Sequence, residues 1–432
     1  MLRIIKYSKK SKLDAVLARP STGNSSLEVV VRKIISGVEK GGDNALMQFS
    51  KKFDGFSGVL TVSEKEFADA KKFVPVELKK AIRTARKNIE KFHASQKQKT
   101  VVVETIPGVK CWRRAVGIES VGLYIPGGSA PLLSTVLMLG VPARLAGCRD
   151  VILCTPAGKD GKVAAAVLFA AECCGVKKIF KVGGAQAIAA MAFGTETIPR
   201  VAKIFGPGNQ YVTSAKQLVS TRGVAIDMPA GPSELAILAD RTSIPKFVAA
   251  DLLSQAEHGP DSQVVLVSDD EEIIRSVNAQ LAEQVRLLPR RSIAERALKN
   301  SRAVLVGSIN SGIEILNAYA PEHLIIACRN AEAISRKVIN AGSVFLGNYS
   351  CESAGDYASG TNHTLPTNGY ARAYSGVSLD SFVKQITFQK LNKKGLTRLG
   401  KTIQLMAEAE GLEAHKNAVA IRLKNEKNKN NV

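Results

Sequence analysis

The fold class is indicated by one stretch, Val151 to Val182, which reads VILCTPAGKDGKVAAAVLFAAECCGVKKIFKV. A short apolar run precedes a loop with Pro and Gly, and a helix-length apolar segment then leads to a second short apolar run. Short apolar runs that alternate with helix-length segments are typical of a mostly parallel sheet covered by helices. The stretch therefore predicts a strand–helix–strand unit of an α/β protein.

The same alternation continues on both sides of this unit, from Ser120 to about Asp380. We expect strands at 151–154, 178–182, 203–205, 235–238, 264–267, 304–306, 324–326 and 344–346, with helices such as 163–174, 273–285 and 313–319 between them. Eight strands exceed what one small sheet usually holds, so we expect two α/β units packed together. Apolar spacing of three and four predicts helices over 29–92. The segment after Asp380 is expected to be a helical docking arm with a polar tail.

Composition limits the class of protein. The 432 residues are 45% apolar and 23% charged, enough for two or three hydrophobic cores. No apolar run reaches the roughly 18 residues of a membrane-spanning helix, and residues 1–13 lack a signal-peptide core and cleavage site. The seven cysteines include no C-x-x-C pair and resemble reduced core thiols. We therefore predict a cytoplasmic enzyme without a membrane partner.

The formal net charge of +22 raises the alternative of a basic scaffold or nucleic-acid-binding protein. Lysines are spread along the whole chain, however, and aromatic residues make up only 5% of it. Dispersed charge with few aromatic side chains does not form the basic, base-stacking surface that nucleic acids require. We predict no nucleic-acid partner.

Histidines indicate where the chemistry lies. Four of the five, His258, His323, His363 and His415, occur in the last 175 positions, each near a carboxylate or amide. Imidazole beside such groups can bind a borderline metal ion or transfer protons near neutral pH. The fifth, His93, lies in a lysine-rich helical stretch without such neighbours.

The segment 245–258, PKFVAADLLSQAEH, is expected to form a helix with Pro in its first turn and Gly-Pro as its stop signal. Gln255 and His258 are three residues apart in the expected last turn, on one face and beside the negative end of the helix dipole. That arrangement suits a metal ion. A helix-terminal histidine satisfied by a backbone carbonyl is the ordinary alternative.

Three further segments carry candidate groups. Glu322 and His323 lie at the entrance of an expected strand, where a carboxylate and an imidazole can divide water activation and proton transfer, or form an ordinary surface pair. Asp356 and His363 fall in an expected loop, 355–366, where an Asx-turn and a solvent-facing side chain are the alternatives. Glu410 and His415 flank Gly411, which predicts a left-handed stop between two helices.

Dinucleotide binding has no local signature. Gly206-Pro207-Gly208 begins a glycine fingerprint, but Tyr211 stands at its third glycine position. Neither a Walker motif nor H-E-x-x-H occurs.

Taken together, these segments resemble the histidinol dehydrogenase family, the enzymes of the last two steps of histidine biosynthesis. The similarity extends roughly from Arg19 to Arg422 and includes VGLYIPGGSAPLLSTVLMLGVPARLAGC, QAIAAMAFGT, IFGPGNQYV, IDMPAGPSE, LLSQAEHGPDSQ, APEHL, GDYASGTNHTLPT and EGLEAHKNAVAIR. Long matches in the same order are far more specific than any one motif above.

The resemblance implies residue roles. It implies one zinc ion per subunit, held by Gln255, His258, Asp356 and His415, with His323 as general base and acid and Glu322 as the activator of water. It implies contacts with the substrate L-histidinol from Ser233, Gln255, His258, His323, Asp356, His363, Glu410 and His415. It also implies NAD contacts from Tyr124, Gln186 and Asn209.

The resemblance further implies a homodimer with composite active sites. The expected fold is α/β, with two incomplete Rossmann-like domains of the aldehyde-dehydrogenase-like kind. Residues 1–20 would form an N-terminal segment, 21–123 with 233–377 the first domain, which carries the metal and catalytic residues, and 124–232 the second, which contacts NAD. Residues 378–432 would form a helical dimerisation arm that contributes to the partner's active site.

One rival chemistry is a thiol route, in which Cys111 or Cys148 traps an aldehyde as a nucleophile. Neither has a recognisable base or activating cation nearby in the sequence, so we expect both to be structural.

Overall fold

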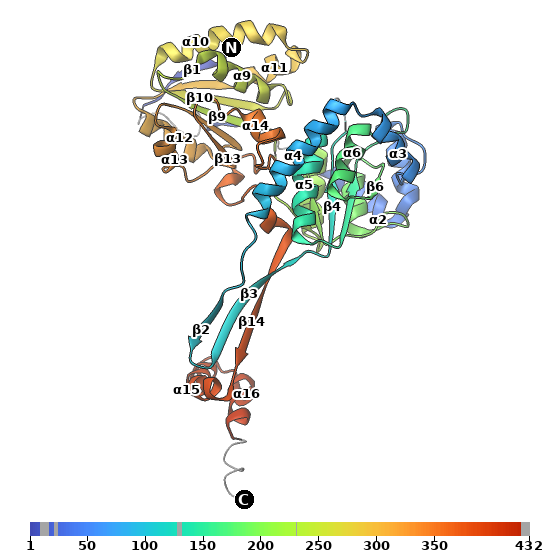
Figure 1. Ribbon diagram of the computed structural model, residues 1–432, viewed down its shortest axis with the longest axis vertical. Coiled ribbons are helices and arrows are strands. Elements are labelled where there is room, and N and C mark those ends of the chain that lie inside the picture. The colour runs from blue at the N-terminus through green and yellow to red at the C-terminus, as the bar shows by residue number, and fades with distance from the viewer. Residues whose placement is uncertain (9–16, 21–24, 128–131, 230, 425–432) are drawn as a thin grey trace, which may run out of the picture. The chain divides into compact units, whose positions relative to one another are not determined.

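The computed structural model describes residues 1–8, 17–20, 25–127, 132–229 and 231–424 (Figure 1). The chain divides into two compact units, described separately below: Met1–Gln96 with Ile118–Phe382, and Lys97–Gly117 with Val383–Val432. Expectations for residues 9–16 and for the polar tail after residue 424 lie outside the described residues.

The first unit contains a six-stranded parallel sheet, in the order β1-β11-β10-β9-β12-β13. Its strands are β1 (Arg3–Lys6), β9 (Glu234–Ala239), β10 (Gln263–Ser268), β11 (Arg302–Leu305), β12 (His323–Ala327) and β13 (Ser343–Leu346). One face is covered by α9 (Pro245–Ala256), α10 (Glu271–Gln284) and α11 (Arg291–Lys299), and the other by α12 (Ile309–Tyr319) and α13 (Ala331–Ser335) (Figure 1). Because helices cover both faces, β9, β10 and β12 are buried at every position.

This unit also contains a five-stranded parallel sheet, in the order β6-β5-β4-β7-β8. Its strands are β4 (Ser120–Tyr124), β5 (Asp150–Cys154), β6 (Lys178–Phe180), β7 (Lys203–Phe205) and β8 (Ala225–Ile226), and its helices are α5 (Leu133–Ala146), α6 (Ala165–Cys174), α7 (Gly184–Phe193) and α8 (Gln210–Ser220). The chain runs outward from β4 to β6 and then returns to place β7 on the other side of β4. This reversal of strand order is the switch point of a Rossmann-like half.

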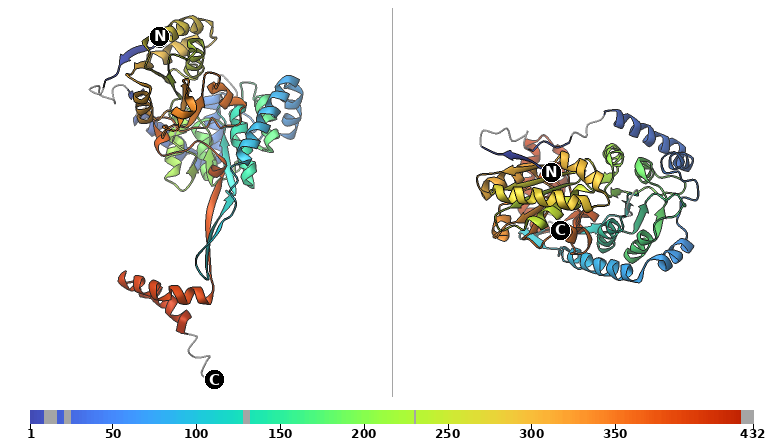
Figure 2. Two further views of the ribbon diagram at one scale, coloured as in Figure 1. Left: turned by 60° about the vertical axis from the view of Figure 1, so that its left-hand side comes forward. Right: turned by 90° about the horizontal axis from the view of Figure 1, so that it is seen from above.

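The helices before β4 are α2 (Ser25–Asp54, with non-helical backbone at Gly42), α3 (Glu64–Phe73) and α4 (Val76–Ala94). They share hydrophobic cores with the helices of the five-stranded sheet, beside which Figure 2 shows them in blue. The sequence prediction instead grouped 21–123 with 233–377. The packing differs because an apolar helix face shows that a helix is covered but does not indicate which sheet covers it.

Each of the eight predicted strands coincides with an observed one, with ends that differ by at most two residues. The α/β class with two parallel sheets is therefore confirmed. The short strands β1, β4 and β8 were not among those predicted. The first unit also contains α14 (Glu352–Tyr357) and the 3-10 turns Val285–Leu287, Tyr370–Arg372 and Leu379–Phe382.

The second unit combines an antiparallel ribbon with two helices. The ribbon has the order β14-β3-β2, from β2 (Val102–Ile106), β3 (Val109–Gly117) and β14 (Val383–Leu391), and α15 (Lys393–Ala409) and α16 (Glu413–Lys424) follow (Figure 1). The expectation of helix throughout the region after Asp380 is wrong for β14. Its side chains are exposed or half-buried at all nine positions, so it lacks the buried apolar run by which the other strands were recognised.

Candidate functional site

Two acidic residues and a histidine meet at the amino edge of the six-stranded sheet. Glu234 is the first residue of β9 and His323 the first residue of β12, and these neighbouring strands are paired in parallel. Glu322 directly precedes β12, as the sequence predicted for a strand entrance. The side chains of all three residues are buried, so their charges have little access to water.

The two nitrogens of His323 have different surroundings. Nδ1 lies 3.3 Å from the carbonyl oxygen of Glu234 and 3.7 Å from Oε2 of Glu322, whereas Nε2 lies 3.5 Å from Oδ1 of Asp356. Burial lowers the pKa of His323, but the negative charges of Glu352, Glu322 and Asp356 outweigh burial and raise it to about 10. Because Nδ1 faces a carbonyl, it is the nitrogen that carries a proton in the neutral ring, and Nε2 is left to exchange one.

Glu322 is held by the backbone of the neighbouring strand. Its Oε2 accepts a hydrogen bond of 2.9 Å from the N–H of Glu234. Burial raises the pKa of Glu322 to about 7. A carboxylate that titrates near neutral pH is matched to the task of a general base.

Glu352 belongs to this cluster and was missed from the sequence. It opens α14, and Asp356 follows four residues later on the same short helix, not in the predicted loop. The side chain of Glu352 is 1% exposed, and burial raises its pKa to about 8. Acidic residues four apart face the same side of a helix, so this spacing could have indicated the pair had the helix been expected.

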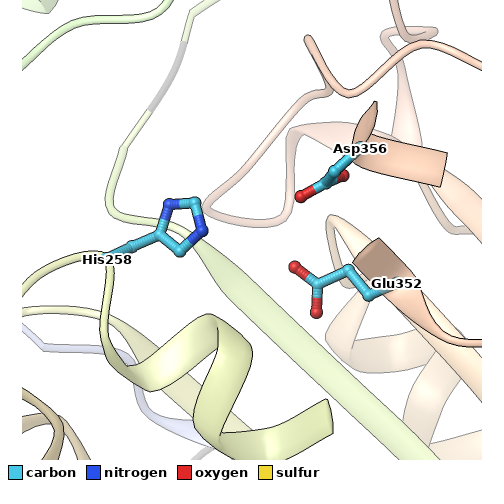
Figure 3. A group of neighbouring side chains, drawn as sticks. All are labelled: His258, Glu352 and Asp356. Atoms are coloured by element: carbon cyan, nitrogen blue, oxygen red, sulfur yellow. The ribbon is translucent and has the colours of Figure 1, made fainter. Parts of the chain in front are cut away.

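His258, Glu352 and Asp356 form a possible metal-binding group. One ligand atom from each lies within 4.8 Å of the other two, and Figure 3 shows the three side chains directed toward a common space. Helix α9 ends at Ala256, so His258 lies just beyond the helix and not in its last turn as predicted.

Gln255 occupies the last turn of α9 and is 1% exposed. With its nitrogen toward Glu352 and its oxygen 3.0 Å from the N–H of Glu234, its carboxamide satisfies both neighbours. The structure therefore brings Gln255, His258 and Asp356 together with Glu322 and His323, five residues to which the family resemblance assigns metal-binding or catalytic roles.

Several buried polar atoms of the cluster lack hydrogen-bond partners among the described residues. They are Nε2 of His323 and Oδ1 of Asp356, which face each other at 3.5 Å without forming a hydrogen bond, and Nε2 of His363. Burial also lowers the pKa of His363, which keeps that ring neutral. Unsatisfied buried polar atoms are costly, and their concentration here is typical of groups that bind a ligand or ion.

Ser233, the remaining predicted substrate contact of the first unit, directly precedes β9 and is half-buried. Its carbonyl accepts a hydrogen bond of 3.1 Å from the N–H of Gln263. Ser233 therefore lies beside Glu234 at the same edge of the sheet.

Glu410 and His415 belong to the second unit, where both are exposed. Glu410 caps α15, Gly411 has a left-handed φ of 70°, and His415 lies in the first turn of α16. The predicted helix stop at Gly411 is confirmed. The expectation that this arm completes a site stays a prediction.

The predicted NAD contacts lie at the carboxyl edge of the five-stranded sheet. Tyr124 ends β4, and its buried hydroxyl accepts a hydrogen bond of 3.1 Å from the N–H of Gly184 at the start of α7. Burial raises the pKa of Tyr124 to about 12. Gln186, in the first turn of α7, donates to Asp54 at 3.4 Å. Asn209 caps α8 by accepting from the two backbone N–H groups that follow it.

A buried ion pair anchors the loop that carries Asn209. Lys216 pairs with Asp227, and Lys216 also donates to the carbonyl of Gly206 at 2.9 Å, while Asp227 accepts from its N–H at 2.8 Å. Gly206 follows β7 with φ 130°, and a Cβ there would lie 2.1 Å from the carbonyl oxygen of Tyr124. The close approach of two backbones thus requires glycine at this position.

A cavity of about 870 Å³ opens next to these groups. Its lining includes Asp54, the partner of Gln186, and residues that follow β4 and β5, namely Pro126, Thr155 and Pro156. The cavity and the predicted NAD contacts therefore share the carboxyl edge of this sheet.

The cysteines give the thiol route little support. Burial raises the pKa of Cys148 to about 11, and its thiol donates to the carbonyl of Phe382 at 3.6 Å. A thiol with a raised pKa is a poor nucleophile because little of it is ionised. Cys111 lies on β3 of the second unit.

Comparisons with known proteins agree on one family. A family model described as histidinol dehydrogenase matches residues 17–423. A histidinol dehydrogenase of Bacteroides fragilis is 56% identical over 423 residues, which cover 98% of this chain and 99% of that protein. The histidinol dehydrogenase of Bacteroides thetaiotaomicron is 56% identical over 424 residues, again 98% and 99% of the two chains.

A solved structure agrees with these relatives. The crystal structure of histidinol dehydrogenase from Elizabethkingia anophelis superimposes with a TM-score of 0.96 at 55% identity, and the match covers 98% of both chains. Among the described residues, no helix combines the length and apolar character needed to cross a membrane.

Proposed function

The chain belongs to the histidinol dehydrogenase family, and we propose that it catalyses the zinc- and NAD-dependent four-electron oxidation of L-histidinol to L-histidine through L-histidinaldehyde. These are the last two steps of histidine biosynthesis. One observation carries this proposal: Glu322, His323, Gln255, His258 and Asp356 gather at one sheet edge in a chain of this family.

We propose that Gln255, His258 and Asp356 hold one zinc ion per subunit, together with His415 from the second subunit of a homodimer. Mixed nitrogen and oxygen donors suit zinc, and Oδ1 of Asp356 has no hydrogen-bond partner among the described residues. The end of α9 adds the negative pole of a helix dipole beside Gln255. When bound, zinc would grip the imidazole and amine of the substrate and offset the negative charge of the carboxylates.

In the first oxidation, His323 would act as the general base once a bound metal ion offsets the carboxylate charges that raise its pKa to about 10 and keep its ring protonated. Its Nδ1–H is directed to the carbonyl of Glu234, which leaves Nε2 to accept the proton of the alcohol. NAD receives the hydride from the carbon that bears the alcohol. The product of this step is the aldehyde, and the binding residues retain it between the two oxidations.

In the second oxidation, Glu322 acts on water. Held by the Glu234 N–H and with a pKa raised to about 7, its carboxylate removes a proton as water adds to the aldehyde carbonyl. The hydrate then transfers a second hydride to a second NAD molecule, loses a hydroxyl proton and becomes the carboxylic acid. Ser233, His363 and Glu410 would contact the substrate, as the resemblance implies.

The proposed NAD contacts are Tyr124, Gln186 and Asn209. Gln186 and Asn209 lie at the N-terminal ends of α7 and α8, where backbone N–H groups and the helix dipole favour an anion such as a pyrophosphate. We also propose that the enzyme is cytoplasmic and works as a homodimer with composite active sites, without a nucleic-acid or membrane partner.

Supplying L-histidinol and NAD to the purified protein tests this function. The expected result is two NADH formed per L-histidinol consumed, with activity lost on removal of metal by a chelator and regained on addition of zinc. A yield of one NADH per substrate would contradict the second oxidation. Full activity after verified removal of the metal would contradict the zinc site.

A further inference from the structure

The guanidinium group of Arg19 forms two hydrogen bonds to the carboxylate of Glu234. Its Nε lies 2.5 Å from Oε1 of Glu234 and its Nη2 lies 3.0 Å from Oε2, which makes a bidentate pair. The same Nη2 donates to the carbonyl of Tyr319 at 2.7 Å, and the guanidinium lies 4.0 Å from the centre of the Tyr319 ring. The side chains of Arg19 and Glu234 are 16% and 3% exposed, so the pair is largely shielded from water.

The pair is fixed from several sides. The hydroxyl of Tyr319 donates to Gln263 at 2.7 Å, and Gln263 donates in turn to the carbonyl of Ala18 at 3.0 Å. Oε1 of Glu234 also accepts from the N–H of Asn368 at 2.9 Å. The side chain of Glu234 therefore has little freedom while Arg19 is in place.

The backbone of Glu234 lies between the proposed catalytic residues. Its N–H donates to Glu322 at 2.9 Å, and its carbonyl lies 3.3 Å from Nδ1 of His323. The oxygen of Gln255 also lies 3.0 Å from this N–H. A shift of the Glu234 backbone, whose N–H and carbonyl belong to two successive peptide groups, would displace both the water-activating carboxylate and the base.

We propose that Arg19 is a positioning residue of this active site. Its forked ion pair fixes Glu234 at the start of β9, and the backbone of Glu234 then holds Glu322 by its N–H and sets the ring of His323 by its carbonyl. This role rests on the proposed function. Arg19 touches neither Glu322 nor His323 in any hydrogen bond or ion pair of the described residues, so it acts on them through the residues that it binds, Glu234 above all.

A guanidinium suits this task better than an ammonium. Its planar fork matches both oxygens of a carboxylate and stacks on the Tyr319 ring at the same time, whereas lysine offers a point charge. Arg19→Lys is therefore expected to preserve the charge balance around buried Glu234 but not the orientation of its backbone N–H and carbonyl.

The test compares Arg19→Met and Arg19→Lys with the parent holoenzyme. We measure zinc content, KM for NAD, KM for L-histidinol, and kcat with the alcohol and with the aldehyde, all per folded and zinc-loaded protein. Arg19→Met is expected to lower kcat with both substrates by about 10²-fold, the effect of displacing reacting groups by roughly 1 Å. KM for NAD should stay within about twofold, since Arg19 has no contact with the proposed NAD residues. The kcat of Arg19→Lys should lie between that of Arg19→Met and that of the parent.

A kinetic isotope effect separates positioning from loss of structure. L-histidinol deuterated at the carbon that loses hydride should show a larger isotope effect in Arg19→Met than in the parent, because chemistry then limits turnover. A lower proportion of folded enzyme would reduce the rate but leave the isotope effect per active site unchanged.

Arg222 supplies a matched control. Arg222 forms a bidentate ion pair with Glu39, at 2.9 and 2.5 Å, and lies 4.5 Å from the centre of the Phe193 ring. Phe193 packs in the hydrophobic core of the five-stranded sheet, so this arginine lies beside the other sheet and not beside the proposed catalytic residues. Arg222→Met is expected to keep the parent kcat and isotope effect.

The outcomes distinguish this role from the proposed function. A parent that does not oxidise L-histidinol would overturn both. An active parent, with Arg19 variants whose kcat and isotope effect per folded, zinc-loaded enzyme match it, would overturn the Arg19 role alone. If Arg19→Met does not fold, a kcat in Arg19→Lys equal to that of the parent is enough to reject the positioning role of Arg19.

Discussion

Two sheet edges carry the proposed site residues, and they have opposite polarity. In the six-stranded sheet, Glu234 and His323 are the first residues of their strands, so the ionisable cluster lies at the amino edge. In the five-stranded sheet, Tyr124 is the last residue of β4 and Gly206 follows β7, so the proposed NAD contacts lie at the carboxyl edge. Only the second edge follows the usual rule for ligands of open α/β sheets.

The difference has an electrostatic reason. Helices that connect parallel strands run opposite to them, so the amino edge of a sheet receives helix C-termini and the carboxyl edge receives helix N-termini. Helix α9 brings its negative end to the cluster of Gln255 and His258, which suits a cation. Helices α7 and α8 bring positive ends to Gln186 and Asn209, which suits phosphate. The two edges are therefore fitted to ligands of opposite charge.

Among variants that test the difference between the two edges, Glu322→Gln at the amino edge is expected to change the rate most. The amide can still accept the Glu234 N–H but cannot remove a proton from water, so oxidation of L-histidinaldehyde should fall by about 10²- to 10⁴-fold. Turnover of the aldehyde and of the alcohol, measured separately, checks the step, and zinc content should not change. Glu314→Gln, at an exposed position of α12, is the control. Parental turnover of the aldehyde in Glu322→Gln would exclude the proposed role.

The second effect concerns the ligand that we propose from the other subunit. His415→Asn should weaken zinc binding by at least about 10²-fold, because loss of a direct ligand exceeds the 10- to 100-fold effect of losing the residues behind a ligand. Metal content after dialysis against graded chelator measures the change. Glu413→Gln, an exposed neighbour on α16, should retain zinc. If His415→Asn retained full zinc occupancy at every chelator concentration, His415 of the arm would not be a zinc ligand.

The third effect tests the carboxyl edge. Asp227→Asn breaks the ion pair with Lys216 that anchors the Gly206 loop, and KM for NAD should rise about tenfold, the equivalent of one charge-assisted hydrogen bond. Leaving Lys216 buried without its partner should also destabilise the fold by about 3–5 kcal/mol. KM for L-histidinol and zinc content should stay parental. Asp150→Asn, which disrupts exposed pairs, is the control. A change in zinc content with an unchanged KM for NAD would reverse our assignment of the two edges.

The smallest effect is expected at Cys148. Cys148→Ala should keep turnover within about twofold of the parent, because a half-buried thiol with a pKa raised to about 11 forms little of the reactive thiolate. Steady-state rates with the alcohol and the aldehyde check this. A loss of two or more orders of magnitude would revive the thiol route.

The parts that sequence reasoning predicted are those with a local cause. Strands such as 151–154 and 235–238 are apolar runs between turn signals, and a strand covered on both faces requires such a run. Gln255 with His258 and Glu322 with His323 are short-range pairs, so their proximity was visible in the sequence. Their convergence on one edge was expected only from the family resemblance.

The parts that were missed depend on long-range contacts. Arg19 and Glu234 are 215 positions apart, and nothing in either segment indicates their pairing. Glu352 joins the cluster because α14 begins at this residue, just before the loop expected at 355–366. Helices α2 to α4 pack on the five-stranded sheet because of tertiary contacts that their own apolar faces do not specify. Residue spacing reports local geometry, whereas these features are set by which surfaces meet in the folded chain.

The most direct test of the account is anomalous diffraction at the zinc absorption edge from crystals of the dimer grown with zinc. We predict one strong peak per subunit within ligand distance of Gln255, His258 and Asp356, with His415 of the second subunit completing the set. A peak elsewhere, or none at this edge in crystals of active enzyme, would contradict the claim that the amino edge of the six-stranded sheet is the metal site.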